Sequence, residues 1–230
     1  MARRQVDTMS LGVGIATGLY GISFGALSVA SGLDVWQTQV LSLLMFSGGS
    51  QFAFIGVVAS GGMSSLPAAI ASAWMLGIRN GFYALQMKPL LGMLGFKMPF
   101  AAQITIDESI GVGTAQDNLA DTRRGFWLTG GFVFLFWNSL TFAGALLGNA
   151  LGDPRVYGLD AAAAGAFLAL LWPRLHSLQP LAVAAGSAVI AVALTPSLPA
   201  GIPILLAALV ALIVGGLNLF KKRISSGDMS

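Results

Sequence analysis

Charged residues are absent from four long stretches of the chain, and this absence constrains the fold more than any other sequence feature. Residues 8–33, 35–78, 125–152 and 175–220 contain no Asp, Glu, Lys or Arg. One crossing of the hydrocarbon core of a bilayer takes about 20 mostly apolar residues, and each stretch is longer than that. The sequence therefore predicts a protein whose helices cross a membrane.

The overall composition excludes several other classes of protein. Only 9% of the 230 residues are charged and 56% are hydrophobic, whereas a soluble domain of this size is usually about 25% charged. A soluble enzyme, a nucleic-acid-binding protein and a disordered chain are therefore poor fits. The net charge of +3 indicates membrane orientation rather than a nucleic-acid partner. The chain has no cysteine, which excludes disulfides and thiolate metal sites.

Turn-forming residues divide the apolar stretches into separate helices. Gly61 and Gly62 mark one turn, and the proline-rich run 195–203 marks another. The predicted fold class is all-α: a polytopic transmembrane helix bundle of seven or eight spans that forms a single domain over residues 1–230. A crossing by the weakest helix gives eight spans with the N-terminus inside, and its absence gives seven with the N-terminus outside. The expected helices are 9–31, 35–60, 65–87, 125–151, 157–173, 178–195 and 200–220, with a weaker one at 99–118.

Two stretches of the sequence resemble each other. Residues 22–27 are followed by Gly-Leu-Asp at 32–34, and residues 141–146 are followed by Gly-Leu-Asp at 158–160. This similarity indicates a two-fold internal repeat of residues 9–98 and 125–220, although chance similarity between glycine-rich helices is the alternative. Eight spans make the repeats parallel and seven make them inverted. Glycines recur every third or fourth residue at 14, 18, 21 and 25, and every fourth at 144, 148 and 152. This spacing favours close helix packing, either within the subunit or against a partner.

Polar residues interrupt the second apolar stretch. Ser47, Gly48, Gly49, Ser50 and Gln51 lie in the middle of an expected span. Adjacent glycines cost about 1 kcal/mol each in a helix relative to alanine. We expect a glycine-broken helix here, because irregular backbone at membrane depth is tolerated where it lines a cavity. The five residues are candidates for substrate binding; a helix-packing patch is the alternative.

Ionisable residues occur near two other expected helices. Arg79 and Tyr83 lie one turn apart on the same helix face. Arg79 has three possible roles: binding a substrate carboxylate, pairing with a buried acid, or extending to the membrane interface. Asp107 and Glu108 are adjacent in the weakly apolar segment and are candidates for proton coupling, with a solvated loop as the alternative.

Trp137 and Asn138 lie in the middle of the span at 125–151, and we include them as candidate substrate-binding residues. Hydrogen bonding between helices is the alternative role for Asn138. His176 is the only histidine, so the sequence offers no histidine cluster for a metal site and no catalytic motif. We therefore expect no metal, no cofactor and no enzymatic activity.

These polar elements, in this order, resemble the AzlC family, the large subunits of branched-chain amino-acid exporters. The similarity extends from about Gly12 to Phe220. The elements that carry it are Ala26-Leu-Ser28, Phe46-Ser-Gly-Gly-Ser-Gln-Phe52, Ile78-Arg79-x-x-x-Tyr83, Asp107-Glu108 and Gly158-Leu-Asp160.

The resemblance implies a secondary transporter of the cell inner membrane that exports branched-chain amino acids and is coupled to an ion gradient. It also implies a small hydrophobic AzlD-type membrane subunit as partner. The matching functional positions are Ser50, Gln51, Arg79, Tyr83, Asp107 and Glu108. The alternative functions are export of another small amphipathic metabolite, or a non-transporting role as a membrane assembly subunit.

Overall fold

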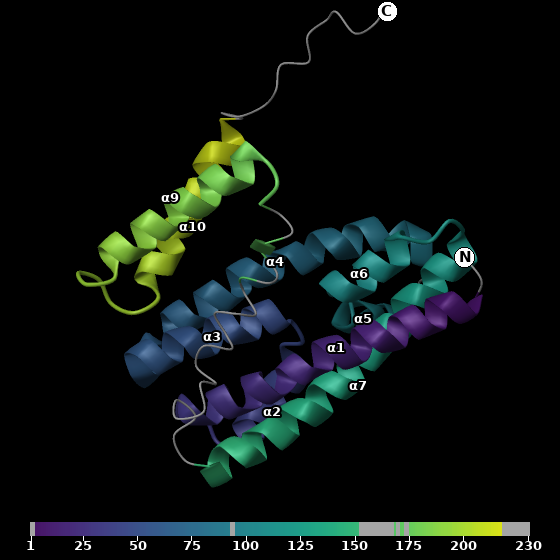
Figure 1. Cartoon of the computed structure of the whole chain (residues 1–230), viewed down its shortest axis with the longest axis horizontal. Helices are drawn as coiled ribbons and strands as arrows, with labels where there is room; N and C mark the ends of the chain where they lie inside the picture. The colour runs from purple at the N-terminus through teal and green to yellow at the C-terminus, as the bar shows by residue number, and fades with distance from the viewer. Residues whose placement is uncertain (1–2, 93–94, 152–167, 169–170, 173–174, 218–230) are drawn as a thin grey trace, which may run out of the picture. The chain divides into compact units, whose positions relative to one another are not determined.

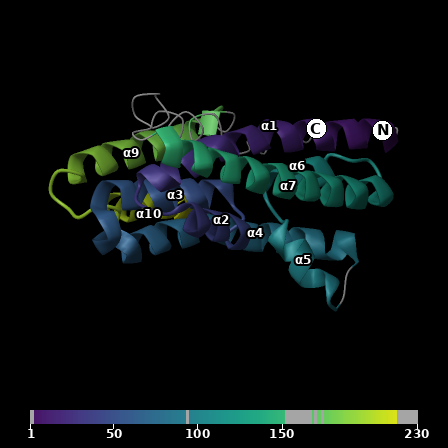
Figure 2. The same ribbon diagram turned by 90° about the horizontal axis from the view of Figure 1, so that it is seen from below.

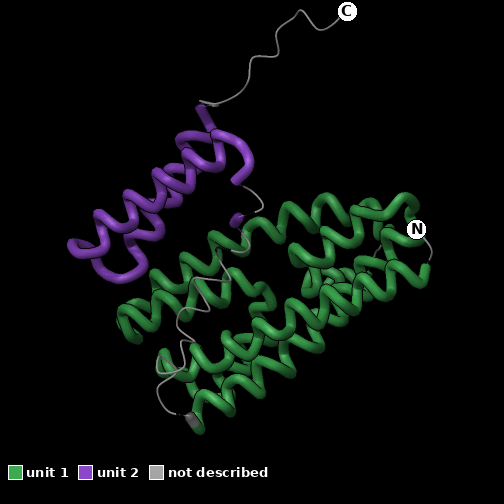
Figure 3. The backbone as a smooth tube through the Cα atoms, viewed as in Figure 1, with its two compact units in different colours: residues 1–166 green, residues 167–230 purple. Residues whose placement is uncertain are grey.

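The computed structural model describes residues 3–92, 95–151, 168, 171–172 and 175–217, and within them the chain is helical without strands. Three helical stretches are long and apolar enough to cross a membrane: Arg3–Ala30, Gly48–Leu91 and Leu119–Ala150. The predicted all-helical membrane protein is thus confirmed. The chain divides into two compact units, residues 1–166 and 167–230 (Figure 3).

The first unit contains most of the helices (Figure 1). Its elements are α1 (Arg3–Ala30), α2 (Val35–Leu44), α3 (Gly48–Gly61), the short 3-10 helix η1 (Gly62–Ser65), α4 (Leu66–Leu91), α5 (Lys97–Gln103), α6 (Asp107–Thr114) and α7 (Leu119–Leu151). In the second unit, α9 (Leu178–Leu194) and α10 (Ile202–Gly216) form a helical hairpin, in which the Ser187 hydroxyl donates to the Ala207 carbonyl at 2.9 Å.

Two expected helices are each divided in two. The span expected at 35–60 is interrupted at residues 45–47, between α2 and α3, so the break precedes the two glycines instead of falling on them. The helix expected at 99–118 becomes α5 and α6, separated by residues 104–106. The predicted turns at 61–62 and 195–203 are confirmed. The helix expected at 157–173, with Asp160, lies almost entirely outside the described residues.

Helices α1 and α7 lie side by side along their length (Figures 1 and 2). They run in the same direction, because residues further along α1 contact residues further along α7. The Thr129 hydroxyl donates to Ser10 at 2.9 Å, and Gly18 faces Phe136. Near the helix ends, Gly25 faces the backbone of Thr141 and Ala145, and Gly144 faces the backbone of Ile22, so closely that neither glycine has room for a Cβ.

The two similar stretches found in the sequence belong to this helix pair. Ser10 and Thr129 are 119 residues apart, and the same offset aligns residues 22–27 with 141–146. Glycines on both helices let the backbones approach, which is how helices associate in lipid where hydrophobic attraction between them is weak. Since α1 and α7 are parallel, the chain returns between them along α4. Leu33, just after α1, packs near Ala69 at the start of α4, and the Leu90 carbonyl at the end of α4 accepts from Arg123 at the start of α7.

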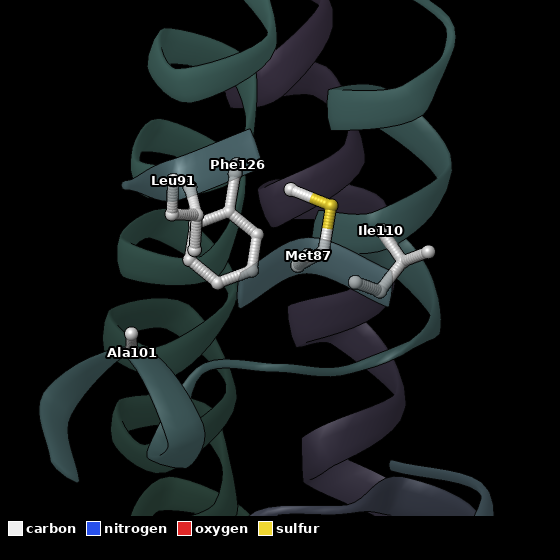
Figure 4. Close-up of a cluster of buried hydrophobic side chains, with 5 residues drawn as sticks. All are labelled: Met87, Leu91, Ala101, Ile110 and Phe126. Atoms are coloured by element: carbon white, nitrogen blue, oxygen red, sulfur yellow. The ribbon is translucent and has the colours of Figure 1, made fainter. Parts of the chain in front are cut away.

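A cluster of buried side chains fixes α5 and α6 against the longer helices (Figure 4). The cluster joins α4, α5, α6 and α7 through Met87, Leu91, Ala101, Ile110 and Phe126. Gly92 ends α4 with φ of 62°, a left-handed conformation that glycine adopts without strain. Beside it, the Arg123 Nε donates to the Leu90 carbonyl at 2.8 Å and satisfies one of the last acceptors of α4.

Candidate functional site

The break between α2 and α3 exposes the first turn of α3. Ser47 is extended, with φ of −157°, and its side chain makes no capping hydrogen bond. The first N–H groups of a helix have no acceptor within the helix itself. The uncapped start of α3 therefore presents donors and the positive end of the helix dipole at the break.

The two glycines at the start of α3 allow two large side chains to approach. A Cβ on Gly48 would lie 3.0 Å from Cη2 of Trp137, and a Cβ on Gly49 would lie 3.0 Å from Nη2 of Arg79. Both distances are shorter than ordinary van der Waals contact. The glycine pair thus allows close packing of these two side chains, which differs from the helix-breaking role expected from the sequence.

Gln51 joins three helices through its side-chain amide. It is completely buried, and its Nε2 donates to the carbonyls of Met45 at 2.7 Å and Ser42 at 3.3 Å. Its Oε1 accepts a hydrogen bond of 2.8 Å from Nε1 of Trp137 on α7. The amide therefore caps the last turn of α2 across the break and fixes the break against α7.

Aromatic rings surround this amide. The Phe24 ring lies 5.8 Å from the Phe52 ring and 6.1 Å from the Trp137 ring, and Phe52 and Trp137 are 6.3 Å apart. These distances fall in the range of favourable aromatic pairs. The rings exclude water from the Gln51–Trp137 hydrogen bond, which strengthens it.

Arg79 and Tyr83 both contact Asp107. The Arg79 Nη2 lies 2.8 Å from Asp107 Oδ2, and the Tyr83 hydroxyl donates to Oδ1 at 2.7 Å. Of the three roles left open for Arg79, the structure contains the pair with an acid, and the two side chains are 28% and 20% exposed. Because Arg79 also packs on Gly49, it bridges the starts of α3 and α6.

The break between α5 and α6 places the two acidic residues. Asp107 is the first residue of α6 and Glu108 is the second, at the helix end where negative charge is favourable. The Ser109 hydroxyl accepts from the Ile106 N–H at 3.1 Å and holds this turn. Within the described part of the chain, Glu108 forms no ion pair, in contrast to Asp107.

A pocket of about 670 Å³ opens beside the α2–α3 break, between α2, α3, α4 and α5. Its lining is mainly aliphatic and aromatic. The lining residues are Leu41, Leu44, Met45, Phe46, Ser47, Ser50, Phe54, Ile70, Ala73, Trp74, Gly77, Ile78, Asn80, Gly81, Ala102 and Gln103.

Two buried polar atoms on this lining have no hydrogen-bond partner. They are Oγ of Ser50, a residue that is 1% exposed, and Oδ1 of Asn80. An unsatisfied buried polar group costs about 1–3 kcal/mol, so each one calls for a physical reason. The two atoms are positioned to accept or donate hydrogen bonds to a bound molecule.

The predicted site residues fall into three groups. Ser47 and Ser50 line the pocket, whereas Gly48, Gly49, Gln51 and Trp137 lie around the break without lining the pocket. Arg79, Tyr83 and Asp107 form the second cluster, with Glu108 adjacent. Asn138 stands apart: its Nδ2 donates to the Phe134 carbonyl of the same helix at 2.8 Å, rather than to a neighbouring helix as the alternative role supposed, and its Oδ1 is buried without a partner.

Asn80 and Gln103 are pocket residues that the sequence analysis did not select. The only signal was a neutral amide in an apolar segment, directly after Arg79 in the case of Asn80. Among the residues that the structure describes, no three His, Cys, Asp or Glu side chains gather as a metal site requires.

Comparison with known families gives one match. The family model described as AzlC protein matches residues 12–151, which is more than half of the chain. No curated protein and no solved structure matches.

Proposed function

Since the chain belongs to the AzlC family, a family associated with branched-chain amino-acid export, we propose that it is a secondary transporter that exports these amino acids. The observation that carries the proposal is the pocket at the α2–α3 break. There the uncapped start of α3 and the unpartnered Ser50 hydroxyl lie beside a mainly apolar wall. An aliphatic zwitterion needs this combination of polar and apolar groups.

The dimensions of the pocket suit a leucine-sized ligand. Small-molecule sites usually have volumes of about 300–1,000 Å³ and apolar linings with a few polar groups. Leu41, Phe54 and Ile78 are among the apolar residues against which an isobutyl side chain would pack. Burial of such a side chain contributes about 1.5–3 kcal/mol.

The substrate carboxylate binds at the start of α3, in this proposal. The first N–H groups of α3, which have no acceptor within the helix, and the helix dipole favour an anion. The unpartnered Ser50 Oγ supplies one further donor at the same place. Gln51 and Trp137 keep these donors in position, because their own side-chain hydrogen bonds are made to the protein.

Coupling to a proton gradient involves the acidic pair on α6. Asp107 is held by Arg79 and Tyr83, whereas Glu108 forms no ion pair among the described residues. Glu108 is therefore the better candidate to exchange a proton. Asp107 holds Arg79 in place through the ion pair. Arg79 also packs on Gly49 at the start of α3. A change in the Arg79–Asp107 ion pair would therefore alter the packing beside the proposed carboxylate site.

The proposed transporter lies in the cell inner membrane and works with a small AzlD-type subunit. The packing of α1 on α7 in the same direction, at the offset of the two similar stretches, supports parallel repeats at 9–98 and 125–220, related by an axis along the membrane normal.

Leucine efflux tests the proposal. Cells that lack their own exporter are loaded with a leucine-containing dipeptide, and efflux of leucine is compared with and without the chain and an AzlD-type subunit. We expect faster efflux with both proteins present, and a loss of at least tenfold in the Ser50→Ala variant. Gly131→Ala is a matched control, because nothing lies within 4 Å of a Cβ at that position.

The outcomes separate the alternatives. Efflux of another amphipathic metabolite without leucine efflux would indicate a different cargo. An absence of transport with the partner present would favour an assembly role.

A further inference from the structure

Asn80 occupies the wall of the pocket that faces the start of α3, and no role has yet been given to it. It lies on α4 directly after Arg79, yet it takes no part in the Arg79–Asp107 ion pair. Its Oδ1 is buried without a hydrogen-bond donor, while its side chain lines the pocket. A buried acceptor that lacks a donor is unfavourable by about 1–3 kcal/mol unless a ligand satisfies it.

The positions of Asn80 and Ser50 are related through Gly77. The Ser50 hydroxyl lies 3.5 Å from the place where a Cβ on Gly77 would be. Asn80 follows Gly77 by three residues, so both lie on the same face of α4, about 5–6 Å apart between Cβ positions. The donors of α3 and the acceptor of Asn80 therefore lie within about one helical turn of each other.

The two sides of the pocket, the start of α3 and the α4 wall with Asn80, offer different chemical groups. The start of α3 offers N–H donors and the positive end of a dipole, which suit a carboxylate but repel an ammonium group. The other side-chain acceptor at the break, Oε1 of Gln51, already accepts from Trp137 and does not line the pocket. Gln103, which also lines the pocket, donates its Nε2 to the Leu43 carbonyl at 2.7 Å. Asn80 Oδ1 is then the unpartnered amide acceptor on the described lining, beside the Ser50 hydroxyl, which can donate to the carboxylate.

From this arrangement we infer that Asn80 binds the α-ammonium group of the substrate and so restricts the transporter to amino acids over the corresponding carboxylic acids. The inference rests on the proposed function and adds the residue that distinguishes the substrate class. The carboxylate lies at α3, the ammonium group at Asn80, and the aliphatic side chain extends along the apolar wall. Gly77 and Gly81, which flank Asn80 on the lining, leave room for the substrate backbone.

Competition between leucine and two analogues tests the inference. Exchange of radiolabelled leucine is measured in proteoliposomes that contain the full chain and an AzlD-type subunit. The competitors are leucine, 4-methylpentanoate, which lacks the amino group, and 3-methylbutylamine, which lacks the carboxylate. The variants are Asn80→Ala and Asn80→Asp. Ser72→Ala is the matched control, since Ser72 also has a buried, unpartnered hydroxyl on α4 but does not line the pocket.

The inference predicts a change that depends on the amino group. In Asn80→Ala, the half-inhibiting concentrations of leucine and 3-methylbutylamine rise about tenfold or more, because a hydrogen bond to a charged group is lost. That of 4-methylpentanoate stays within twofold. Asn80→Asp restores leucine binding and weakens 4-methylpentanoate, since a carboxylate attracts the ammonium group and repels the acid. Ser72→Ala leaves all three values unchanged.

Other outcomes overturn the inference. An equal rise for all three compounds in Asn80→Ala would indicate a purely structural role, and no rise would show that Asn80 does not contact the substrate. A wild-type chain that does not exchange leucine would refute the proposed function, and this inference with it.

Discussion

Replacing Gln51 with leucine removes three hydrogen bonds at the α2–α3 break with little change in side-chain size. The lost bonds are those from Nε2 to the Met45 and Ser42 carbonyls and the one from Trp137 to Oε1. Hydrogen bonds between helices in membranes contribute about 0.6–2 kcal/mol each. Because Gln51 is fully buried, no water replaces them, and the total loss should be about 2–6 kcal/mol.

The Trp137→Phe substitution removes only one of these bonds and provides the second corner of a double-mutant cycle. It should cost about 1–3 kcal/mol, with the Gln51 Oε1 left without a donor. In the double variant the Trp137 N–H is absent, so the Gln51→Leu change no longer leaves it unpaired. The losses in unfolding free energy of the two single variants should therefore sum to about 1 kcal/mol more than the loss in the double variant.

Thermal unfolding of the purified chain in detergent measures these effects. A change of 1 kcal/mol shifts the midpoint by roughly 2–4 °C in a domain of this size, so Gln51→Leu should lower it by about 4–24 °C. Leucine exchange in the same variants should lose maximal rate more than apparent affinity, since Gln51 positions the break. Additive midpoint shifts, or a loss confined to leucine affinity, would refute the positioning role of Gln51.

Further substitutions test the packing and the charges. Gly25→Ala should prevent assembly of α1 on α7, because its Cβ would overlap the Ala145 backbone. Gly12→Ala is the control, with nothing within 4 Å of its Cβ, and should leave expression and unfolding unchanged. Normal expression of both variants would contradict the close packing of α1 on α7. Arg79→Gln should abolish leucine exchange, because it leaves Asp107 without its cation, and adding Asp107→Asn should recover part of that exchange. Equal inactivity of the single and double variants would argue against a role for the Arg79–Asp107 ion pair. Glu108→Gln should keep leucine exchange but lose transport driven by a pH gradient, while retention of both would refute proton coupling through Glu108.

The helical membrane fold was predictable because it depends on where charges are absent. A bilayer excludes charge over about 30 Å, so long charge-free stretches predict helices that cross it, and three helical stretches of the described residues are long and apolar enough to do so. The α1–α7 pairing was not predicted: the similarity of residues 22–27 and 141–146 indicated an internal repeat, and only the structure shows that the two helices pack at the same offset.

The position of the helix break was predicted only approximately. The glycines at 48–49 marked the correct region, but the chain breaks at 45–47 and the glycines serve the approach of Trp137 and Arg79. Those side chains belong to other helices, and the sequence carries no local sign of which residue will pack on a glycine. For the same reason, Arg79 had three possible roles until the structure placed Asp107, at the start of α6, beside it.

The pocket itself could not be derived from sequence. Its walls come from four helices whose relative positions depend on tertiary packing, and Asn80 and Ser50 become significant only because they are buried without partners. In the sequence, an isolated amide beside an arginine has many possible roles.

The central claim is that leucine binds in the pocket beside the α2–α3 break. A diazirine analogue of leucine, activated by light in membranes that contain the chain and its partner, reports the binding position directly through the peptides it labels. We predict adducts on pocket residues of α2, α3 and α4, such as Leu41, Phe54 and Ile78, that disappear with excess leucine. Labelling confined to α9 or α10, or labelling that excess leucine does not prevent, would contradict the claim.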